Sequence, residues 1–272
     1  MDTDPIVGTQ VAGYSIESVL GRGGMGVVYL ARQHSPDRRV ALKLINPAFA
    51  DDDTFRRRFL RESVAAAAID HPHILPVYDA GESEGVLFMA MRLVDGKDLR
   101  EILRVSERLE TERVLAIIGQ VGGALDAAHA RGLVHRDVKP GNILVAQQPE
   151  ADDTDFCYLT DFGVSVWTTS SAATMTTAGH MVGSANYAAP EQVEGKRVDA
   201  RADVYSLGCV LYECLTGSVP FAGRSGPGIL FAHLHEEPPR PSSLWPGLPP
   251  AVDAVVGRAL VMREAKRLPS SD

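Results

Sequence analysis

The distribution of hydrophobic and polar positions changes near residues 92–96. Before this point, short apolar runs typical of strands alternate with turn residues, at 14–20, 27–31, 40–45, 74–80 and 85–94. A helix is expected over 54–70, with Thr54 as its N-cap and three aspartates before it that favour the positive end of the helix dipole. The first part of the chain is therefore predicted to form a small β-rich unit.

After residue 96 the apolar positions follow helical spacing. One helix is expected over 111–131 with Gly132 as its C-cap, and another over 204–215 that ends before Gly217. The second is apolar nearly all round, which predicts a helix buried on every side. Further helical patterns lie at 229–234 and 251–261. A β-rich part followed by a helical part predicts an α+β fold.

The net charge narrows the range of partners. The chain has 272 residues, with Lys+Arg 27 and Asp+Glu 35, and a net charge of -8. This acidic balance argues against sequence-independent nucleic-acid binding and against anchoring to an anionic membrane surface. No apolar run approaches the roughly 18 residues that a membrane helix needs. We therefore expect no nucleic-acid partner and no membrane segment in this chain.

The cysteines and histidines indicate no metal site. Cys157, Cys209 and Cys214 are few, odd in number and without metal-ligand spacing. They are typical of reduced core thiols, which predicts a cytoplasmic location for this part of the protein.

Three glycines form the first candidate binding motif. Gly21, Gly23 and Gly26 give the pattern G-x-G-x-x-G-x-V, in which backbone N–H groups can approach phosphate oxygens closely. The same spacing occurs in dinucleotide-binding folds, where the loop opens a helix. Here a strand follows at 27–31, so the loop is predicted to be the tip of a hairpin. On this motif alone, a glycine-rich turn without a ligand stays an open alternative.

A lysine and a glutamate extend the motif. Lys43 lies inside an apolar strand, where a lone lysine would usually extend its ammonium group to the surface. Glu62 falls on the apolar stripe of the expected helix, close to Phe55 and Phe59, and a carboxylate there is costly unless it is paired. We expect Glu62 to pair with Lys43 and to direct its ammonium group towards phosphates.

With three further motifs, the chain resembles the protein kinase family. Residues 133–142 match the catalytic loop, Asp161-Phe162-Gly163 the metal-binding motif, and Ala189-Pro190-Glu191 the end of the activation segment. The resemblance extends from about Tyr14 to Arg267 and is strongest to the eukaryotic-type (Hanks-type) Ser/Thr kinases of bacteria, particularly actinobacteria. It implies a bilobal kinase fold, with an antiparallel N-lobe over 1–93 and a mostly helical C-lobe over 94–272.

The resemblance also implies the chemistry. Asp137 would orient the substrate hydroxyl, Lys139 would neutralise the moving phosphoryl group and favour a Ser or Thr acceptor, and Asn142 and Asp161 would hold Mg²⁺ or Mn²⁺. The residues implied for ATP are Leu20, Gly21, Gly23, Gly26, Val28, Ala41, Lys43, Met91, Val94 and Leu144. The activation segment argues for protein substrates over small molecules. A pseudokinase acting as a scaffold is the alternative, although nothing in the sequence favours it.

Regulatory roles follow from the same resemblance. Arg136 would pair with a phosphate on the activation segment, where Thr176 and Thr177 are the expected autophosphorylation sites. Ser184 occupies the position of a threonine that bridges Asp137 and Lys139 in the family.

The resemblance implies three structural roles as well. Asp203 would hold the backbone of the catalytic loop, and Glu191 would form a buried ion pair with Arg267. Residues 147–155 are expected to be an inserted acidic loop between two short strands, and 269–272 the start of a truncated last helix. Kinases of this type often dimerise through the N-lobe, and the parent protein could carry a membrane anchor outside this chain.

Overall fold

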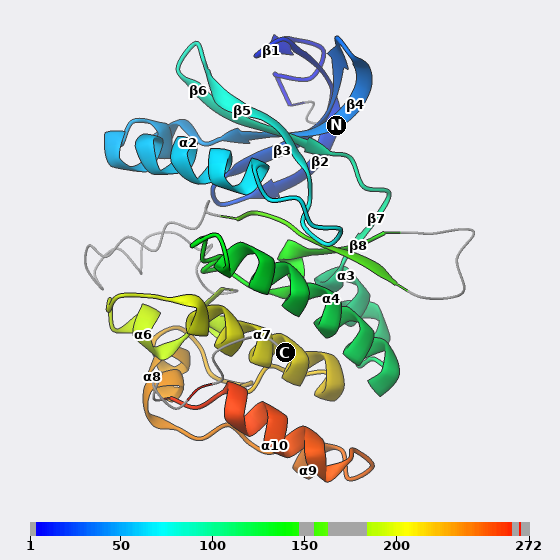
Figure 1. Cartoon of the computed structure of the whole chain (residues 1–272), viewed down its shortest axis with the longest axis vertical. Coiled ribbons are helices and arrows are strands. Elements are labelled where there is room, and N and C mark those ends of the chain that lie inside the picture. The colour runs from blue at the N-terminus through cyan, green and yellow to red at the C-terminus, as the bar shows by residue number, and fades with distance from the viewer. Residues whose placement is uncertain (1–3, 147–154, 163–183, 263–266, 268–272) are drawn as a thin grey trace. The chain divides into compact units, whose positions relative to one another are not determined.

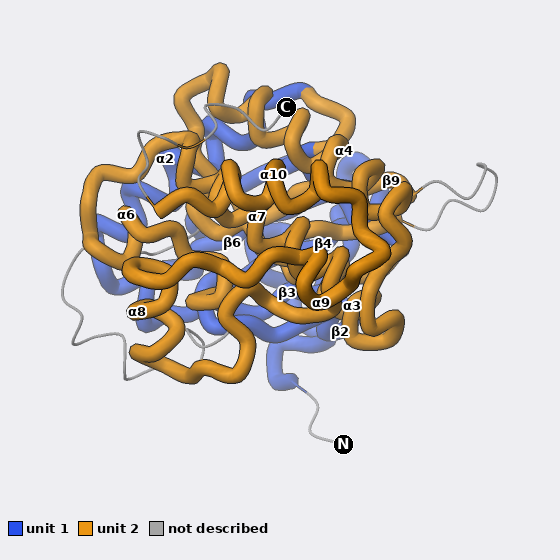
Figure 2. Tube along the Cα trace, turned by 90° about the horizontal axis from the view of Figure 1, so that it is seen from below, with its two compact units in different colours: residues 1–70, 74–95 blue, residues 71–73, 96–272 orange. Residues whose placement is uncertain are grey.

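The computed structural model describes residues 4–146, 155–162, 184–262 and 267. The expectations that concern Gly163, Thr176 and Thr177, the loop over 147–154 and the helix at 269–272 lie outside the described residues. The chain divides into two compact units, Met1–Asp70 with Ile74–Asp95, and His71–His73 with Gly96–Asp272 (Figure 2). The second segment of unit 1 ends at Asp95, whereas we expected the boundary between the two lobes after residue 93.

Unit 1 is built on one antiparallel sheet with the strand order β1-β2-β3-β4-β6-β5 (Figure 1). The strands are β1 Gln10–Val11, β2 Tyr14–Gly23, β3 Gly26–His34, β4 Asp37–Ile45, β5 Val77–Ser83 and β6 Val86–Arg92. The predicted runs fall on β2 to β6, but the run at 74–80 was placed too early, because Ile74 and Leu75 are buried outside any strand.

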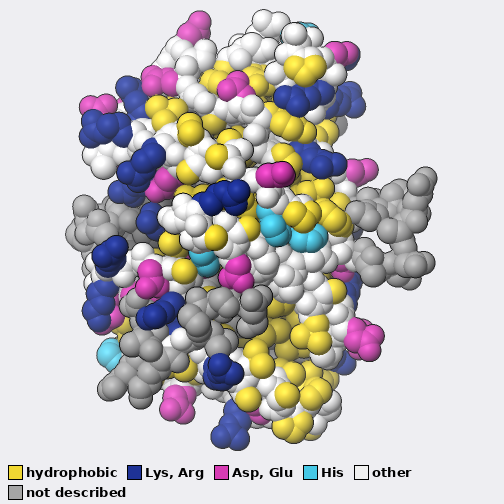
Figure 3. All heavy atoms as spheres, in the orientation of Figure 1, with side chains coloured by type: hydrophobic (Ala, Val, Ile, Leu, Met, Phe, Trp, Pro, Cys, Tyr) yellow, Lys and Arg dark blue, Asp and Glu magenta, His cyan; other side chains and the backbone are white. Residues whose placement is uncertain are grey.

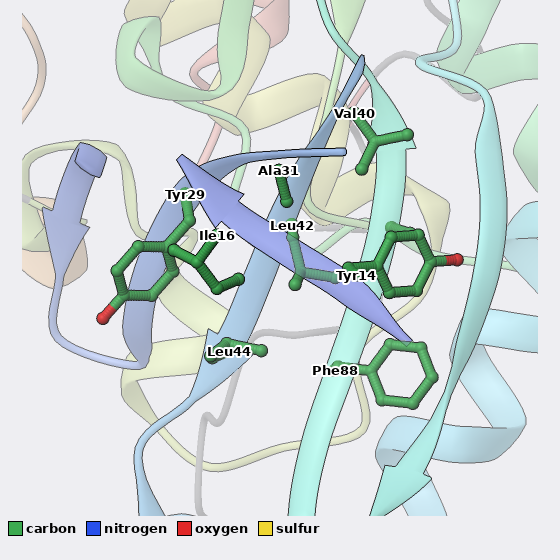
Figure 4. Close-up of a cluster of buried hydrophobic side chains, with 9 residues drawn as sticks. Tyr14, Ile16, Tyr29, Ala31, Val40, Leu42, Leu44 and Phe88 are labelled. Carbon is green, nitrogen blue, oxygen red and sulfur yellow. The ribbon is translucent and has the colours of Figure 1, made fainter. Parts of the chain in front are cut away.

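The alternation of side chains gives the sheet two different faces. One face carries a buried cluster (Figure 4), formed by Tyr14, Ile16, Tyr29, Ala31, Val40, Leu42, Leu44, Phe88 and Ala90. Ile6, Val7, Val11 and Ala12 of the N-terminal segment pack against this cluster. The side chains of β3, β4 and β6 that alternate with these residues lie on the opposite face of the sheet.

Two helices complete unit 1, α1 Pro47–Ala50 and α2 Asp53–Ala67. The predicted N-cap of α2 was wrong: the Asp52 carboxylate accepts hydrogen bonds from the N–H groups of Thr54 (2.8 Å) and Phe55 (3.3 Å). An aspartate in this position satisfies two free donors and places its charge at the positive end of the helix. The helix ends at Ala67 and not at Asp70.

Unit 2 combines a three-stranded sheet, in the order β7-β8-β9, with helices (Figure 1). Its strands are β7 Gly96–Asp98, β8 Ile143–Ala146 and β9 Phe156–Leu159. The α-helices are α3 Leu99–Ser106, α4 Thr111–His129, α6 Pro190–Val193, α7 Ala200–Thr216, α8 Pro227–His235, α9 Pro241–Leu244 and α10 Pro250–Ala259. Short 3₁₀ turns lie at Pro140–Asn142 and Ala185–Tyr187. None of the helices in the described ranges has both the length and the apolar character needed to cross a membrane.

The ends of the two longest helices of unit 2 test the predicted caps. Helix α7 is buried almost throughout and ends at Gly217, whose φ of 76° is left-handed, as predicted. A side chain there would also collide with the carbonyl oxygen of Glu107, 2.4 Å from the position of a Cβ. For α4 the C-cap is Ala130 and not Gly132, which has a φ of 74° in the turn that follows.

Candidate active site

The glycine-rich segment forms the tip of the β2–β3 hairpin, where Gly23 pairs with Gly26. A Cβ on Gly26 would lie 1.9 Å from the Leu44 carbonyl oxygen, so packing alone requires glycine there. At Gly23 the nearest described atom would be 3.9 Å away, and at Gly21 none would come within 4 Å. The fold therefore gives no reason for glycine at positions 21 and 23, whereas the close approach of a phosphate to the backbone would.

The strand register brings four of the residues implied for ATP in unit 1 onto one face of the sheet. Val28 lies opposite Lys43, and Ala41 lies opposite Met91, so these four side chains share the face that does not carry the buried cluster. Leu20 is 49% exposed at the hairpin, which leaves a large apolar side chain available to a ligand. Val94 also belongs to unit 1, whereas Leu144 lies on β8 of unit 2.

Lys43 and Glu62 are both buried in unit 1, each 7% exposed. Glu62 lies on the buried side of α2 together with Phe55 and Phe59, as the sequence pattern predicted. Its Oε1 is 3.5 Å from Nη2 of Arg61, which is itself largely exposed. A buried charge costs less free energy when it is paired with an opposite charge, which favours an ion pair between these two side chains. The pairing of Lys43 with Glu62 stays a prediction.

The catalytic-loop residues form a compact cluster in unit 2. The Lys139 ammonium group donates to Asp137 Oδ2 at 2.6 Å and to the Ser184 hydroxyl at 2.8 Å. Lys139 thus holds one carboxylate oxygen of Asp137 and joins it to Ser184, which is 45 positions away from Lys139. Of the bridge that the resemblance implied for Ser184, the structure shows the contact with Lys139, and the contact with Asp137 stays a prediction.

Asn142 is oriented by the same carboxylate. Its Nδ2 donates to the Asp137 carbonyl oxygen at 2.7 Å and to Asp137 Oδ2 at 3.2 Å. Because the amide nitrogen is occupied, the carbonyl oxygen of the Asn142 side chain remains for a cation. The Thr160 N–H bonds the Asn142 backbone carbonyl at 3.0 Å, so Asn142 and Asp161 lie at the same end of the β8–β9 hairpin.

The side-chain oxygens of Asn142 and Asp161 fit the ligand preference of magnesium. Asp161 has a left-handed φ of 67°, a conformation that costs a non-glycine residue about 1–3 kcal/mol and is concentrated at functional sites. Among the residues that the structure describes, no three His, Cys, Asp or Glu side chains form a group that could hold a metal. One carboxylate with one amide oxygen suits Mg²⁺, which completes its coordination with water and substrate phosphates.

Asp203 anchors the backbone of the catalytic loop. Its fully buried carboxylate accepts hydrogen bonds from the N–H groups of His135 (2.8 Å) and Arg136 (2.7 Å), the contacts that the resemblance implied. It also contacts Nε2 of His129 at 2.7 Å. A hydrogen-bonded or an exposed structural role was expected for His129, and the first is confirmed. Its partner could not be predicted, because a histidine at the end of a helix gives no signal of the group it contacts.

Glu191 and Arg267 form the implied ion pair, with contacts of 2.6 Å and 3.1 Å and side chains 3% and 0% exposed. Nothing in the sequence indicated a role for Gln192, which follows Glu191 and donates a hydrogen bond to the catalytic loop.

In the view of Figure 3, the drawn Lys and Arg side chains are interspersed with Asp and Glu over the visible face.

Comparisons with known proteins give a consistent result. The family model of the protein kinase domain matches residues 14–270. The serine/threonine-protein kinase PknD of Mycobacterium tuberculosis is 45% identical over 271 residues, which cover 99% of this chain and 40% of PknD. PknE of the same organism is 45% identical over 260 residues, 96% of this chain and 44% of PknE. The crystal structure of the Mycobacterium tuberculosis PknI kinase domain superposes with a TM-score of 0.78 at 38% identity, covering 97% of this chain and 94% of that one. The chain thus spans less than half the length of these curated relatives.

Proposed function

The chain belongs to the protein kinase family, and from this premise we propose that it transfers the γ-phosphoryl group of ATP to serine and threonine hydroxyls of proteins. The observation that carries the proposal is the cluster of Asp137, Lys139 and Ser184, with contacts of 2.6 Å and 2.8 Å. Phosphoryl transfer needs positioning and charge neutralisation more than covalent help, and this cluster supplies both.

In this proposal the residues of unit 2 act on the acceptor and on the transferred group. Asp137 accepts a hydrogen bond from the substrate hydroxyl and orients it for attack on the γ-phosphorus. Lys139 keeps one carboxylate oxygen in place and offsets the negative charge of the phosphoryl group. Mg²⁺ or Mn²⁺ would neutralise phosphate charge when bound, and Asn142 and Asp161 are the residues that would hold it.

The residues of unit 1 would hold the nucleotide. The backbone at Gly21 and Gly23 would bond phosphate oxygens, and Val28, Ala41 and Met91 would contact adenine. Lys43 would hold the α- and β-phosphates, with Glu62 fixing the position of its ammonium group. The open backbone at the hairpin tip and the shared face of these side chains support this assignment.

Regulation, partners and location are proposals with the same basis. Phosphate on Thr176 or Thr177 would pair with Arg136 and order the activation segment, as part of signalling to protein substrates. Two copies could associate through the N-lobe. The three described cysteines are free and buried, which supports a reducing, cytoplasmic location for this domain. Burial raises the pKa of the Cys157 thiol to about 12 and so keeps it unreactive. A membrane anchor elsewhere in a longer protein is compatible with this location.

The experiment that tests the proposal compares wild type with Asp137→Asn. Transfer of labelled phosphate to a Ser/Thr peptide should fall at least about 100-fold in Asp137→Asn, while binding of ATP persists. Mass spectrometry should find phosphate on Thr176 or Thr177 of wild type only. The matched control is Asp70→Asn, which changes an exposed carboxylate and should keep wild-type transfer. ATP binding without transfer by wild type would support the pseudokinase alternative instead.

A further inference from the structure

The backbone of Arg136, directly before the proposed catalytic aspartate, has an uncommon conformation. Its φ is 67°, in the left-handed region that favours glycine. A non-glycine residue keeps this conformation only where the surrounding contacts hold it. The orientation of Asp137 therefore depends on the groups that fix the two peptide units beside Arg136.

The peptide unit before Arg136 is fixed by Asp203. The Arg136 N–H donates to Asp203 Oδ1 at 2.7 Å, and the His135 N–H donates to Oδ2 at 2.8 Å. The family resemblance already implied these contacts. They do not fix the second peptide unit, between Arg136 and Asp137.

The peptide unit between Arg136 and Asp137 is held at both ends. Its carbonyl oxygen accepts a 2.9 Å hydrogen bond from Nε2 of Gln192, and its N–H lies 3.2 Å from Nδ1 of His135. Nε2 of His135 is 2.8 Å from the Thr160 carbonyl oxygen. Because a carbonyl can only accept, Nε2 carries the proton and Nδ1 is free to accept from Asp137.

The Gln192 side chain is suited to this contact by its chemistry. It is 6% exposed and lies in the first turn of α6, where its Oε1 accepts from the Ala189 N–H at 3.0 Å. One primary amide thus donates to the catalytic loop and accepts from the chain before α6. A carboxylate offers only acceptors and an ammonium group only donors, so neither could make both contacts.

We propose that Gln192 is a positioning residue for phosphoryl transfer, which fixes the Arg136–Asp137 peptide and through it the carboxylate of Asp137. This inference rests on the proposed kinase function. It acts at the chemical step, because Gln192 holds the residue that orients the acceptor and not a group that binds ATP. Its loss should therefore lower kcat and leave KM almost unchanged.

The competing explanation is that Gln192 only caps α6. Two substitutions separate the roles. Gln192→Glu keeps the side-chain size and an oxygen that accepts from Ala189, but it replaces the donor that faces the Arg136 carbonyl with a second oxygen. Gln192→Met keeps a similar length and removes both contacts.

The expected result is that both variants lose at least about tenfold in kcat, because small misplacements of a reacting group are costly, while KM for ATP and for peptide changes less than about twofold. Hydrogen exchange should be faster at the amide of Asp137 in Gln192→Glu and unchanged at the amide of Ala189, whose N–H donates to the side chain at position 192. This readout reports on the loop without relying on activity. A Gln192→Glu variant with wild-type kcat and wild-type exchange at Asp137 would overturn the inference and assign the residue to capping alone.

Gln120 provides a matched control in the same unit. Its Nε2 donates to the Asp155 carbonyl oxygen at 2.8 Å and its Oε1 accepts from the Cys157 N–H at 2.8 Å, so it is also an amide that bridges two backbone groups. Gln120→Glu should keep the kcat of wild type. Wild type is measured first: if it transfers no phosphate, the proposed function fails and the inference with it. If wild type is active and Gln192→Glu equals it, only the inference fails.

Discussion

At the scale of single residues, the Glu213 carboxylate is partly buried and makes one short hydrogen bond. Burial on helix α7 raises the pKa of its carboxyl group, and the Tyr187 hydroxyl opposes this by donating a 2.6 Å hydrogen bond to Oε2. A donor to the ionised form favours that form. The pair connects α7 to the 3₁₀ turn Ala185–Tyr187, close in sequence to Ser184.

Removal of the hydroxyl in Tyr187→Phe should therefore destabilise the fold by about 1–3 kcal/mol at neutral pH, because a partly buried carboxylate loses its donor. The pKa of Glu213 then rises further, and a raised carboxyl pKa lowers stability as pH rises through it. The cost should accordingly be smaller at pH 5 than at pH 7.5, as measured by urea unfolding. In a Glu213→Gln background the same substitution should cost less and should lose its pH dependence. An equal cost at both pH values would contradict the prediction.

Residues of this kind also mark the limit of what sequence alone could predict at the site. Asp137, Asn142 and Asp161 were identified because their types recur at fixed spacing within motifs. Gln192 is 56 positions from its partner Arg136 and belongs to no motif with fixed spacing, so the neighbouring sequence does not indicate the contact. The partner of His129 could not be predicted for the same reason.

At the scale of elements, the N-terminal segment over residues 4–11 is tied to the glycine-rich hairpin. The Asp4 carboxylate accepts hydrogen bonds from the Ile6 N–H (3.1 Å), the Tyr29 hydroxyl (3.1 Å) and Nη2 of Arg22 (2.5 Å). The Gly8 N–H continues the segment along β2 by donating to the Ile16 carbonyl at 3.0 Å. The family match begins at residue 14, so this cover of the buried cluster lies outside it.

Asp4→Asn should lower the thermal stability of the chain at pH 7. The hydrogen bond from the Ile6 backbone, followed by those from Tyr29 and Arg22, holds the pKa of Asp4 below its ordinary value of 3.8. A lowered carboxyl pKa adds stability above the unfolded-state pKa that is lost as pH falls through the folded-state value. The difference in melting temperature between wild type and Asp4→Asn should thus be largest near neutral pH and should shrink as the pH falls below 3.8, the ordinary pKa of the carboxyl group.

The control for this measurement is Glu17→Gln, which removes a partly exposed surface pair with Arg39 of 3.0 Å on the same sheet. Exposed pairs contribute about 0–1 kcal/mol, so this variant should melt close to wild type. If the difference in melting temperature between wild type and Asp4→Asn stayed constant from pH 7 to pH 3, the effect would come from packing and not from the charge of Asp4.

The elements themselves were predictable where periodicity was long. Helix α7 and its end at Gly217 were predicted because apolar residues and a terminal glycine agree over many positions. Helix α3 was missed, since Leu99 and Leu103 are its buried residues and give only one turn of signal. The N-cap of α2 was placed two residues late because three consecutive aspartates precede it, and only the backbone path decides which of them caps.

At the scale of the whole molecule, one guanidinium group joins three distant segments of unit 2. Besides its ion pair with Glu191, Arg267 donates to the carbonyl oxygens of Val261 (2.9 Å), Arg201 (3.1 Å) and Met262 (3.3 Å). The contacts link the starts of α6 and α7 to the chain that follows α10, across 76 positions between the charged partners. A fully buried fork with every donor direction in use cannot be replaced by lysine.

This arrangement predicts strongly non-additive energetics. Glu191→Leu and Arg267→Leu should each destabilise unit 2 by about 3–5 kcal/mol, because each leaves one buried charge without its partner. The double variant should lose clearly less than the sum, since it removes both charges together. Urea unfolding followed by tryptophan fluorescence measures this, because both tryptophans, Trp167 and Trp245, lie in the Gly96–Asp272 part of the chain. Additive losses would mean that the contacts of Arg267 with the carbonyl oxygens carry the stability and that the ion pair contributes little.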